Sequence, residues 1–221
     1  MRCLYHLPLS PFCRKIRLVL SEKKLDVVLL EEPVWEKRLD FIRLNPASQV
    51  PVLKIDGLII SESNAIFEYL EEVYSQTLLL PQNSVDKVEA RRFNYWFDDT
   101  FHNGVTSKLL YQRVNKKLSK TGQPDSVLIK SGISELKFHL DYLDKVLDDR
   151  RWLAGDTMTI ADFAGAAHFS TLDYIGAIDW SMSDSIKIWY SKIKSRPAFR
   201  SILKDYLPGF APPDHYADLD F

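Results

Sequence analysis

The sequence predicts a mixed α/β domain followed by an all-helical domain. Short apolar runs with the length of buried strands occur only in the first part of the chain, where they alternate with a helical pattern. Residues 75–85 (SQTLLLPQNSV) break that pattern as a linker would. Beyond them apolar residues recur at helical spacing and no convincing strand follows.

These observations divide the 221 residues into four expected segments. We expect an α/β domain over residues 1–76, a linker over 77–85, a helical domain over 86–205 and a C-terminal tail over 206–221. A chain of this length is long enough to bury a sizeable core.

Composition narrows the class of protein. Apolar residues make up 46% and charged residues 27%, as in an ordinary globular protein. The formal net charge of -1 disfavours a nucleic-acid partner, because such proteins usually carry a basic excess. No apolar run approaches the roughly 20 residues that a bilayer requires, and no signal-peptide layout opens the chain. Cys3 and Cys13 form no secreted-style framework, so we expect a cytoplasmic protein.

The α/β domain is expected to follow the order β-α-β-α-β-β-α, which is that of a thioredoxin-like domain. Its first helix would join two parallel strands by a right-handed crossover. Asp56-Gly57 is a hairpin signal, and a serine at 61 or 63 is the expected N-cap of the last helix. Strands are predicted at 2–6, 25–30, 50–55 and 58–60, and helices or irregular turns at 12–23, 35–44 and after 63.

The stretch LSPFCRKIRLVL, residues 9–20, is the chemical centre of the sequence. Pro11 suits the first turn of a helix, so Ser10 should lie at the helix N-terminus, just past the end of a strand. Unpaired backbone N–H groups and the positive end of the helix dipole stabilise an anion there, and the Ser10 hydroxyl could hold a thiolate. The basic residues Arg14, Lys15 and Arg17 are predicted to lie largely off the apolar stripe of this helix.

The helical domain is predicted from long periodic segments. Thr159 and Asp162 form a capping box that starts one helix. The tail is too rich in proline and turn residues to be helical. Helices are expected over 86–118, 126–149, from about 160, and near 182–194 and 197–204.

Four motifs in this order resemble the cytosolic glutathione S-transferase superfamily, whose fold is a thioredoxin-like domain followed by an all-helical domain. The first resembles the active-site motif of serine-type classes, the second a segment whose proline is cis, the third the start of the third helix, and the fourth the folding motif of the helical domain. They are SPFCR at 10–14, NPASQVPVL at 45–53, ESNAI at 62–66 and MTIAD at 158–162.

The resemblance implies a serine-type glutathione S-transferase in which glutathione is the co-substrate and no metal takes part. Ser10 would donate a hydrogen bond to the glutathione sulfur, stabilise the thiolate and assist its attack on a small electrophile. Val50 would pair with the extended peptide, while Glu62 and Ser63 would bind its ammonium and carboxylate groups. The predicted catalytic residue is Ser10, and the predicted glutathione-binding residues are Ser10, Phe12, Gln49, Val50, Pro51, Glu62 and Ser63.

Each of these assignments has a structural alternative. Ser10 caps the first helix whether or not it is catalytic. Cys13 occupies the second position of a CxxC pattern that lacks its first cysteine, which favours a small buried residue over a redox centre. An aromatic stripe on the first long helix could line an electrophile pocket, although such stripes more often form a core or a dimer interface; it comprises Phe93, Trp96, Phe97 and Phe101.

Two features favour a second function. No lysine or arginine lies between Pro46 and Pro51, where several serine-type classes bind the glycine-end carboxylate of glutathione. Trp35, in EEPVWEKR, and the tail PPDHYADLDF place aromatic residues in segments expected at the surface, where they are favoured at interfaces.

Together with residues 7–20, these segments resemble a group within the superfamily, the FtsZ-binding division proteins of the FzlA type. The alternative to the enzyme is therefore a non-catalytic dimer that binds FtsZ filaments and regulates bacterial cell division. Its partner-binding residues would be Trp35, Asp218, Leu219 and Phe221.

The structural alternative for these two segments is that Trp35 covers the second helix and that the tail folds back on the N-terminal domain, without binding a partner. For either function the family implies a homodimer whose interface lies near Arg91 and Arg92.

Overall fold

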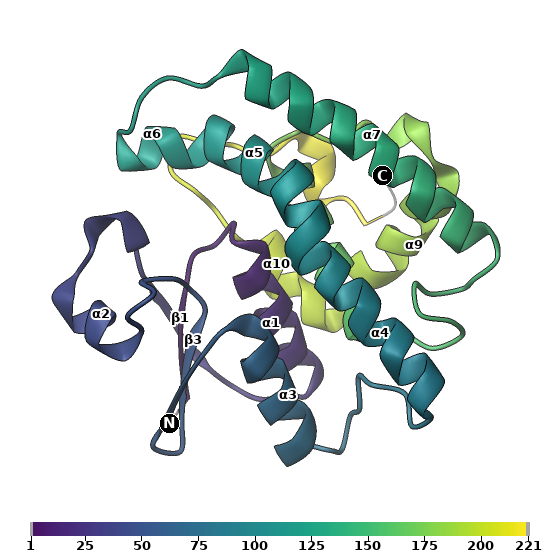
Figure 1. Cartoon of the computed structure of the whole chain (residues 1–221), viewed down its shortest axis with the longest axis horizontal. Helices are drawn as coiled ribbons and strands as arrows, with labels where there is room; N and C mark the ends of the chain where they lie inside the picture. Colours follow the sequence, from purple (N-terminus) through teal and green to yellow (C-terminus); the bar gives the residue numbers. More distant parts are fainter. Residues whose placement is uncertain (1, 220–221) are drawn as a thin grey trace. The chain divides into compact units, whose positions relative to one another are not determined.

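The computed structural model describes residues 2–219, and it separates the chain into two compact units. The first unit extends to Leu78 and includes the later segment Pro197–Asp205. The second comprises Leu79–Arg196 and the tail from Tyr206. Figure 1 colours the chain by residue number, so the returning segment near α10 can be followed.

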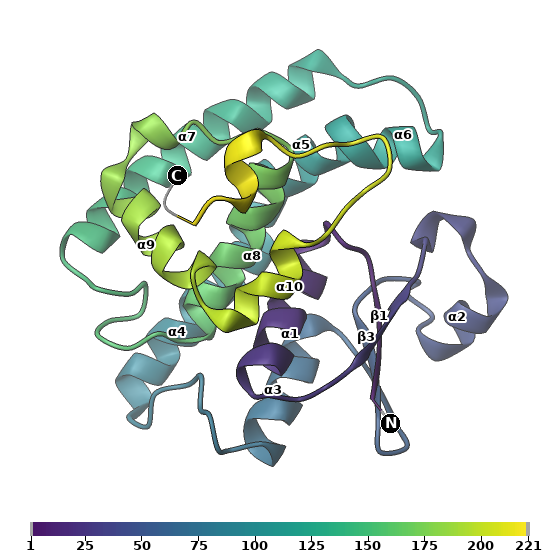
Figure 2. The same cartoon turned by 180° about the vertical axis from the view of Figure 1, so that it is seen from behind.

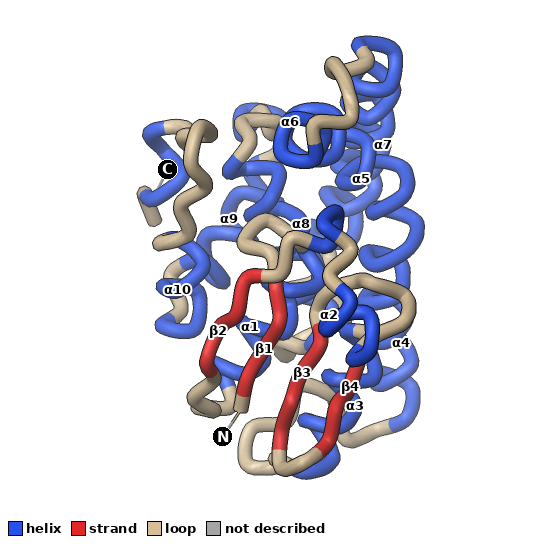
Figure 3. Tube along the Cα trace, turned by 90° about the vertical axis from the view of Figure 1, so that its left-hand side faces the viewer, coloured by secondary structure: helices blue, strands red, loops and turns tan. Residues whose placement is uncertain are grey.

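The α/β unit is built on a four-stranded mixed sheet with strand order β2-β1-β3-β4 (Figure 3). β1 is parallel to β2 and antiparallel to β3, and β3 is antiparallel to β4. α1 and α3 pack together on one face of the sheet, and α2 lies on the other (Figures 1 and 2). This arrangement confirms the predicted thioredoxin-like order; its elements are β1 Cys3–His6, α1 Pro11–Glu22, β2 Val28–Glu31, the 3-10 turn Val34–Glu36, α2 Leu39–Leu44, β3 Val52–Ile55, β4 Leu58–Ser61 and α3 Ser63–Val73.

The hairpin between β3 and β4 turns where the sequence predicted it. Asp56 and Gly57 have φ values of 49° and 85°. Two successive positive φ angles are what a two-residue type I′ turn requires, and Asp-Gly adopts them readily. The turn thereby sets the register in which Ile55 pairs with Leu58.

The burial of α1 differs from the prediction. Arg14 and Lys15 are fully buried and Arg17 is 5% exposed, although all three were expected largely off the buried stripe. The reason is that α1 is covered a second time, by the 3-10 turn Pro197–Phe199 and by α10, Arg200–Leu203. A helix enclosed on several sides must bury its polar residues as well, and these need partners within the protein.

The start of α3 also differs from the prediction. Its N-cap is Glu62, not one of the flanking serines, and the Glu62 side chain makes no capping hydrogen bond. Glu62 has φ 69° and ψ 121°. A residue that caps a helix through its side chain usually has an extended backbone with a negative φ, so the cap position here does not have the geometry expected for a serine cap.

The second unit is helical throughout its regular structure, as predicted. Its first helical run is continuous from Ser84 to Ser119 and contains π-helical turns at Phe97–Thr106 and Tyr111–Asn115. Such turns insert an extra residue into the hydrogen-bond pattern and shift the helix face that follows. The elements are α4 Ser84–Trp96, α5 Ser107–Leu110, α6 Lys116–Ser119, α7 Ser126–Asp148, α8 Ile160–Tyr174, the 3-10 turn Trp180–Met182, α9 Asp184–Lys194 and the 3-10 turn Asp214–Ala217.

α8 forms the centre of the helical unit and every one of its residues is buried. The predicted capping box is present at its start, because the Asp162 carboxylate accepts the Thr159 N–H at 2.8 Å. The same carboxylate accepts the Leu153 N–H at 3.0 Å and the Trp189 Nε1–H at 2.9 Å. Asp162 therefore satisfies three donors from different parts of the unit.

The aromatic stripe on the first helical run belongs to the core. Phe93, Phe97 and Phe101 are fully buried, and Trp96 packs edge-on against Phe97 with ring centroids 4.8 Å apart. These positions hold the helices together, so the structure supports the core interpretation of the stripe.

The described part of the tail packs as a member of the helical unit. Tyr216 is 1% exposed and its ring meets that of Tyr174 edge-on, with centroids 5.2 Å apart. His215 contacts the buried Asp173 carboxylate through Nε2 at 3.0 Å, and its carbonyl accepts a hydrogen bond from Lys194 Nζ at 3.3 Å. The tail contains a single 3-10 turn up to residue 219, which agrees with the predicted lack of an α-helix.

Candidate functional site

Three segments that carry the predicted glutathione-site residues meet at one edge of the sheet. The register places Tyr5 of β1, Val52 of β3 and Ser61 of β4 side by side. β1 and β4 end at this edge and β3 begins there, because β3 is antiparallel to both. The predicted residues flank these strand ends: Ser10 and Phe12 after β1, Gln49, Val50 and Pro51 before β3, and Glu62 and Ser63 after β4.

Ser10 is the N-cap of α1, as predicted. Its Oγ accepts the Cys13 N–H at 3.4 Å, and its backbone is extended with φ -70° and ψ 120°. The first turn of α1 contains no acidic residue, so the positive end of the helix dipole has no charged side chain of its own to balance it there. Ser10 is half-buried, and its hydroxyl group also lies within hydrogen-bond reach of the Cys13 thiol.

Cys13 lies in the core beneath this cap. It is fully buried, and burial raises the pKa of its thiol to about 11 despite the opposing hydrogen bond from Ser10. A thiol with so high a pKa is a poor nucleophile at neutral pH. The geometry therefore agrees with a buried structural cysteine and not with a redox centre.

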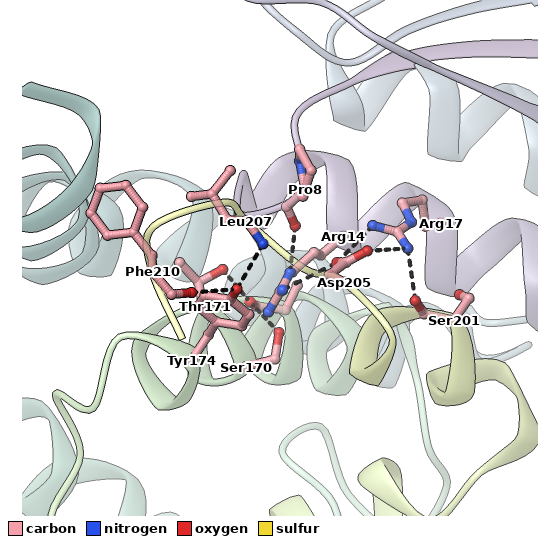
Figure 4. Close-up of polar contacts among 11 residues, drawn as sticks. Pro8, Arg14, Arg17, Ser170, Thr171, Tyr174, Ser201, Asp205, Leu207 and Phe210 are labelled. Atoms are coloured by element: carbon pink, nitrogen blue, oxygen red, sulfur yellow. Dashed lines mark hydrogen bonds and ion pairs between the residues drawn. The ribbon is translucent and has the colours of Figure 1, made fainter. Parts of the chain in front are cut away.

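The arginines of α1 form a polar network inside the protein (Figure 4). Arg14 Nε donates to the Pro8 carbonyl at 2.7 Å, which holds the loop that leads to Ser10. Arg14 and Arg17 both pair with the Asp205 carboxylate, at 3.1 Å and 2.9 Å. Arg17 also donates to the Ser201 carbonyl at 3.0 Å. The contacts with Ser201 and Asp205 join residues 184 to 191 positions apart, and sequence reasoning missed them.

A second polar contact joins the starts of α1 and α3. Lys15 Nζ donates to the Asn64 side-chain oxygen at 2.9 Å, and Lys15 is fully buried. This hydrogen bond ties the helix that carries Ser10 to the helix that begins at Ser63. The two helix N-termini are therefore held in a defined relation within the α/β unit.

The Val50-Pro51 peptide bond is cis, as the resemblance implied. Val50 is half-buried and lies outside the sheet, and within residues 2–219 no hydrogen bond engages its backbone. The neighbouring Gln49 carbonyl accepts the Asn45 side-chain amide at 2.9 Å. The Val50 N–H and C=O are thus the pair of main-chain groups here that an extended ligand could engage.

Glu62 and Ser63 present different environments to a ligand. Glu62 is exposed, whereas Ser63 is 7% exposed and is the first residue of α3. A non-glycine residue at a φ of 69° and a ψ of 121° is strained by about 1–3 kcal/mol, and such strain is concentrated at functional sites.

The segment between Pro46 and Pro51, expected to bind the glycine end of glutathione, contains no lysine or arginine. Gln49 is exposed and Ser48, with φ 52°, is 7% exposed. The Ser48 hydroxyl has no hydrogen-bond partner among the described residues. This segment therefore offers hydroxyl and amide groups in place of the cation that a carboxylate would prefer.

The predicted partner-binding residues fall on both units. Trp35 lies in the 3-10 turn of the α/β unit and is half-buried, near Leu39, which is 72% exposed. Asp218 is exposed and Leu219 is 40% exposed, both in the tail of the helical unit. Phe221 lies outside the described residues.

Two further classes of site were searched for among residues 2–219. No group of three or more His, Cys, Asp or Glu side chains in this range is placed to hold a metal ion. No helix in the same range is long and apolar enough to cross a membrane.

Comparison with known families places this fold in a class of proteins. The glutathione S-transferase N-terminal domain matches residues 4–78, and the glutathione S-transferase C-terminal domain matches residues 130–207. The chain belongs to the glutathione S-transferase family.

Within this family the chain is similar along its whole length to a protein that is named for FtsZ and not for glutathione. FtsZ-localized protein A of Caulobacter vibrioides (strain NA1000 / CB15N) is 43% identical over 224 residues, covering 100% of this chain and 98% of that protein. The structure of FzlA from C. crescentus superposes with a TM-score of 0.96 at 43% identity, covering 100% and 99% of the two chains. A glutathione S-transferase structure from Rhodospirillum rubrum F11 superposes with a TM-score of 0.97 at 44% identity, covering both chains fully.

Proposed function

We propose that this protein is a cytoplasmic division protein that binds FtsZ filaments through the glutathione S-transferase fold. The observation that carries the proposal is the full-length similarity to FtsZ-localized protein A, which at 43% identity covers 98% of that protein. The alignment therefore includes the tail, beyond the two family domains that end at residue 207. A tail that is shared along with the fold supports a shared partner.

Two structural features support this proposal. Trp35 and Leu39 place two large apolar side chains at the surface of one short segment, as an interface needs. The tail is anchored at Tyr216 and leaves Asp218 and Leu219 exposed beyond the anchor. An anchored base lowers the entropy lost when the last residues of the tail bind a partner.

The test is co-sedimentation of the full-length protein with assembled FtsZ filaments. We expect the wild-type protein to pellet with the filaments, and Trp35→Ala or deletion of residues 218–221 to leave most of it in the supernatant. Phe138→Ala is the matched control, because Phe138 is an aromatic residue on α7 that is 66% exposed. A folded wild-type protein that stays in the supernatant at every filament concentration would show the proposal to be wrong.

A second candidate function is glutathione binding with thiolate transfer at the sheet edge. The strained backbone of Glu62 favours it, because the Glu62 side chain is exposed and makes no capping hydrogen bond to α3. In this proposal Ser10 donates a hydrogen bond to the glutathione sulfur, and the thiolate attacks a small electrophile and displaces its leaving group. Phe12, Gln49, Val50, Pro51, Glu62 and Ser63 bind the tripeptide.

The two functions are separable, because each makes use of different residues. Filament binding needs Trp35 and the tail, whereas glutathione binding needs Ser10 and Glu62. In both cases we propose a homodimer. An exposed apolar row on α4 supports it: Val85, Val88 and Tyr95 are 79%, 65% and 63% exposed. Apolar rows of this kind on one helix mark interfaces.

A further inference from the structure

A run of basic residues interrupts the otherwise balanced charge of the chain. Between Thr100 and Pro124 there are five lysines and arginines and no aspartate or glutamate, in a protein whose formal net charge is -1. The run covers the last turns of the first long helical segment and the loop that leads to α7 (Figure 1). Neither function proposed above makes use of it.

Four of these cations line one hollow of the helical unit. The hollow has a volume of about 400 Å³, within the usual range for small-molecule sites. Its walls come from the π-helical turn Tyr111–Asn115, from α6 and from the following loop, in which Gly122 has φ 126°. The lining side chains include Arg113, Lys116, Lys117, Lys120, Gln123 and Pro124.

No carboxylate neutralises these four cations. None of the ion pairs among residues 2–219 involves Arg113, Lys116, Lys117 or Lys120. Burial lowers the pKa of the Arg113 guanidinium, and no neighbouring carboxylate opposes this effect. The hollow is therefore a concentration of positive charge without an internal counter-charge.

The contacts that two of these cations do make orient them without cancelling their charge. Arg113 Nη1 donates to the carbonyls of Ile175 and Gly176, at 3.1 Å and 3.3 Å, beyond the end of α8. Lys116 Nζ donates to the Gln123 carbonyl at 3.0 Å. Arg113 keeps its remaining N–H groups for another acceptor, and Lys116 keeps two of its three.

A purely structural role does not account for the cluster. Lysines near a helix C-terminus interact favourably with the helix dipole, but that dipole amounts to only about half a negative charge. The four positive charges around this hollow far exceed the half negative charge of the helix dipole. They repel one another unless an anion lies between them. Lys117 lies over the Phe210 ring at 4.7 Å, which places its ammonium group but leaves its charge in place.

We propose that this hollow binds a small phosphate-bearing anion with two or more negative charges. An acidic peptide fits less well, because Pro124 is the one apolar residue among the six lining side chains named above, and peptides need apolar anchors. Guanidinium and ammonium groups on the side chains that line one hollow match the several oxygens of a di- or triphosphate. None of the residues that line it is among those proposed above to bind glutathione or FtsZ.

The test is calorimetric titration of the full-length protein with inorganic pyrophosphate and with ATP, at low and high salt. We expect the wild-type protein to bind and the affinity to fall as salt rises. Lys117→Gln with Lys120→Gln should raise the Kd about tenfold or more, because two charge-assisted contacts are lost. Both residues are exposed, so the variant should fold, and arginine at the same two positions should retain binding.

Lys137→Gln with Lys145→Gln is the matched control, since it removes two exposed lysines from α7 and should leave the Kd within about twofold. Three results would overturn the proposal. The first is the absence of binding heat at millimolar pyrophosphate and ATP. The second is equal weakening in both double variants, which would indicate a net-charge effect only. The third is binding to phosphatidylglycerol vesicles but not to either soluble phosphate.

Discussion

Glu62 has a backbone conformation that non-glycine residues rarely adopt, at the start of α3 beside the predicted glutathione site. Its carboxylate is exposed, so the strain brings no packing in return. Strain without a structural benefit is expected where a side chain is needed for binding. Replacement of Glu62 can therefore separate the effect of its backbone strain on stability from the effect of its carboxylate on ligand binding.

We predict that Glu62→Gly raises the free energy of unfolding by about 1 kcal/mol relative to Glu62→Ala. Glycine relieves the strain at this positive φ, and this gain exceeds the larger entropic cost of ordering a glycine, whereas alanine keeps the strain. Both variants lack the carboxylate, so both should lose glutathione binding. Urea unfolding measures the first effect, and calorimetric titration with glutathione measures the second.

Two outcomes would contradict this account. Equal stability of the glycine and alanine variants would mean that the backbone is not strained. Failure of the wild-type protein to bind glutathione at about 10 mM, which corresponds to a binding free energy weaker than about 3 kcal/mol, would rule out the transferase function. It would leave the filament-binding proposal untouched, because that proposal makes no use of Glu62.

At the scale of elements, α1 and the segment Pro197–Asp205 depend on one another. The Asp205 side chain is 10% exposed and pairs with two arginines whose side chains are 0% and 4% exposed (Figure 4). Charges this deeply buried are tolerated only with a counter-charge and hydrogen bonds. The same Arg14 side chain holds the Pro8 carbonyl, so the pair also supports the loop that precedes Ser10.

We predict that Asp205→Ala lowers the free energy of unfolding by about 3–5 kcal/mol, because two buried guanidinium groups lose their counter-charge. Urea denaturation with an unchanged m-value measures the effect. Asp40→Ala is the control. Its pair with Arg43 is exposed on both sides, so it should cost less than about 0.5 kcal/mol. A loss below about 1 kcal/mol for Asp205→Ala would show that water already solvates the pair.

At the scale of the whole molecule, the exposed apolar row on α4 is the kind of surface that another protein surface covers. Val85, Val88 and Tyr95 recur at the spacing of one helix face and are largely exposed in the single chain. Arg92, expected near the interface, is held on this helix by Glu89 at 2.8 Å. A second copy of the chain would cover the row, as the family implies.

We predict that the wild-type protein sediments at twice the 25.6 kDa chain mass and that Val88→Glu sediments as the single chain. A charge introduced into an apolar interface must be desolvated without a partner, which disfavours the dimer. Val127→Glu, at a position on α7 that is 72% exposed, should leave the mass unchanged. A monomeric wild-type protein, or equal dissociation of both variants, would contradict the dimer.

Much of the fold was predictable because its signals are local. The Asp56-Gly57 turn, the Ser10 cap and the Thr159–Asp162 capping box each involve residues no more than three positions apart. The apolar periods identified the strands and helices for the same reason. Strand order then follows, because few arrangements satisfy the rules of connection and handedness.

Other features could not be predicted, because they are decided by residues far apart in the chain. The burial of Arg14 and Arg17 depends on Asp205, which lies 191 and 188 positions away from them and pairs with both when α10 packs on α1. The backbone of Glu62 depends on where β4 ends and α3 begins, and a serine cap was the better local expectation.

The sequence by itself determined the fold class, the family and the candidate residues, since these depend on local patterns and motifs. Only the tertiary structure decided that Ser10, Val50 and Glu62 lie at one edge of the sheet and that four cations surround one hollow. The physical reason is that burial and charge pairing depend on contacts between distant segments, which a pattern of neighbouring residues does not record.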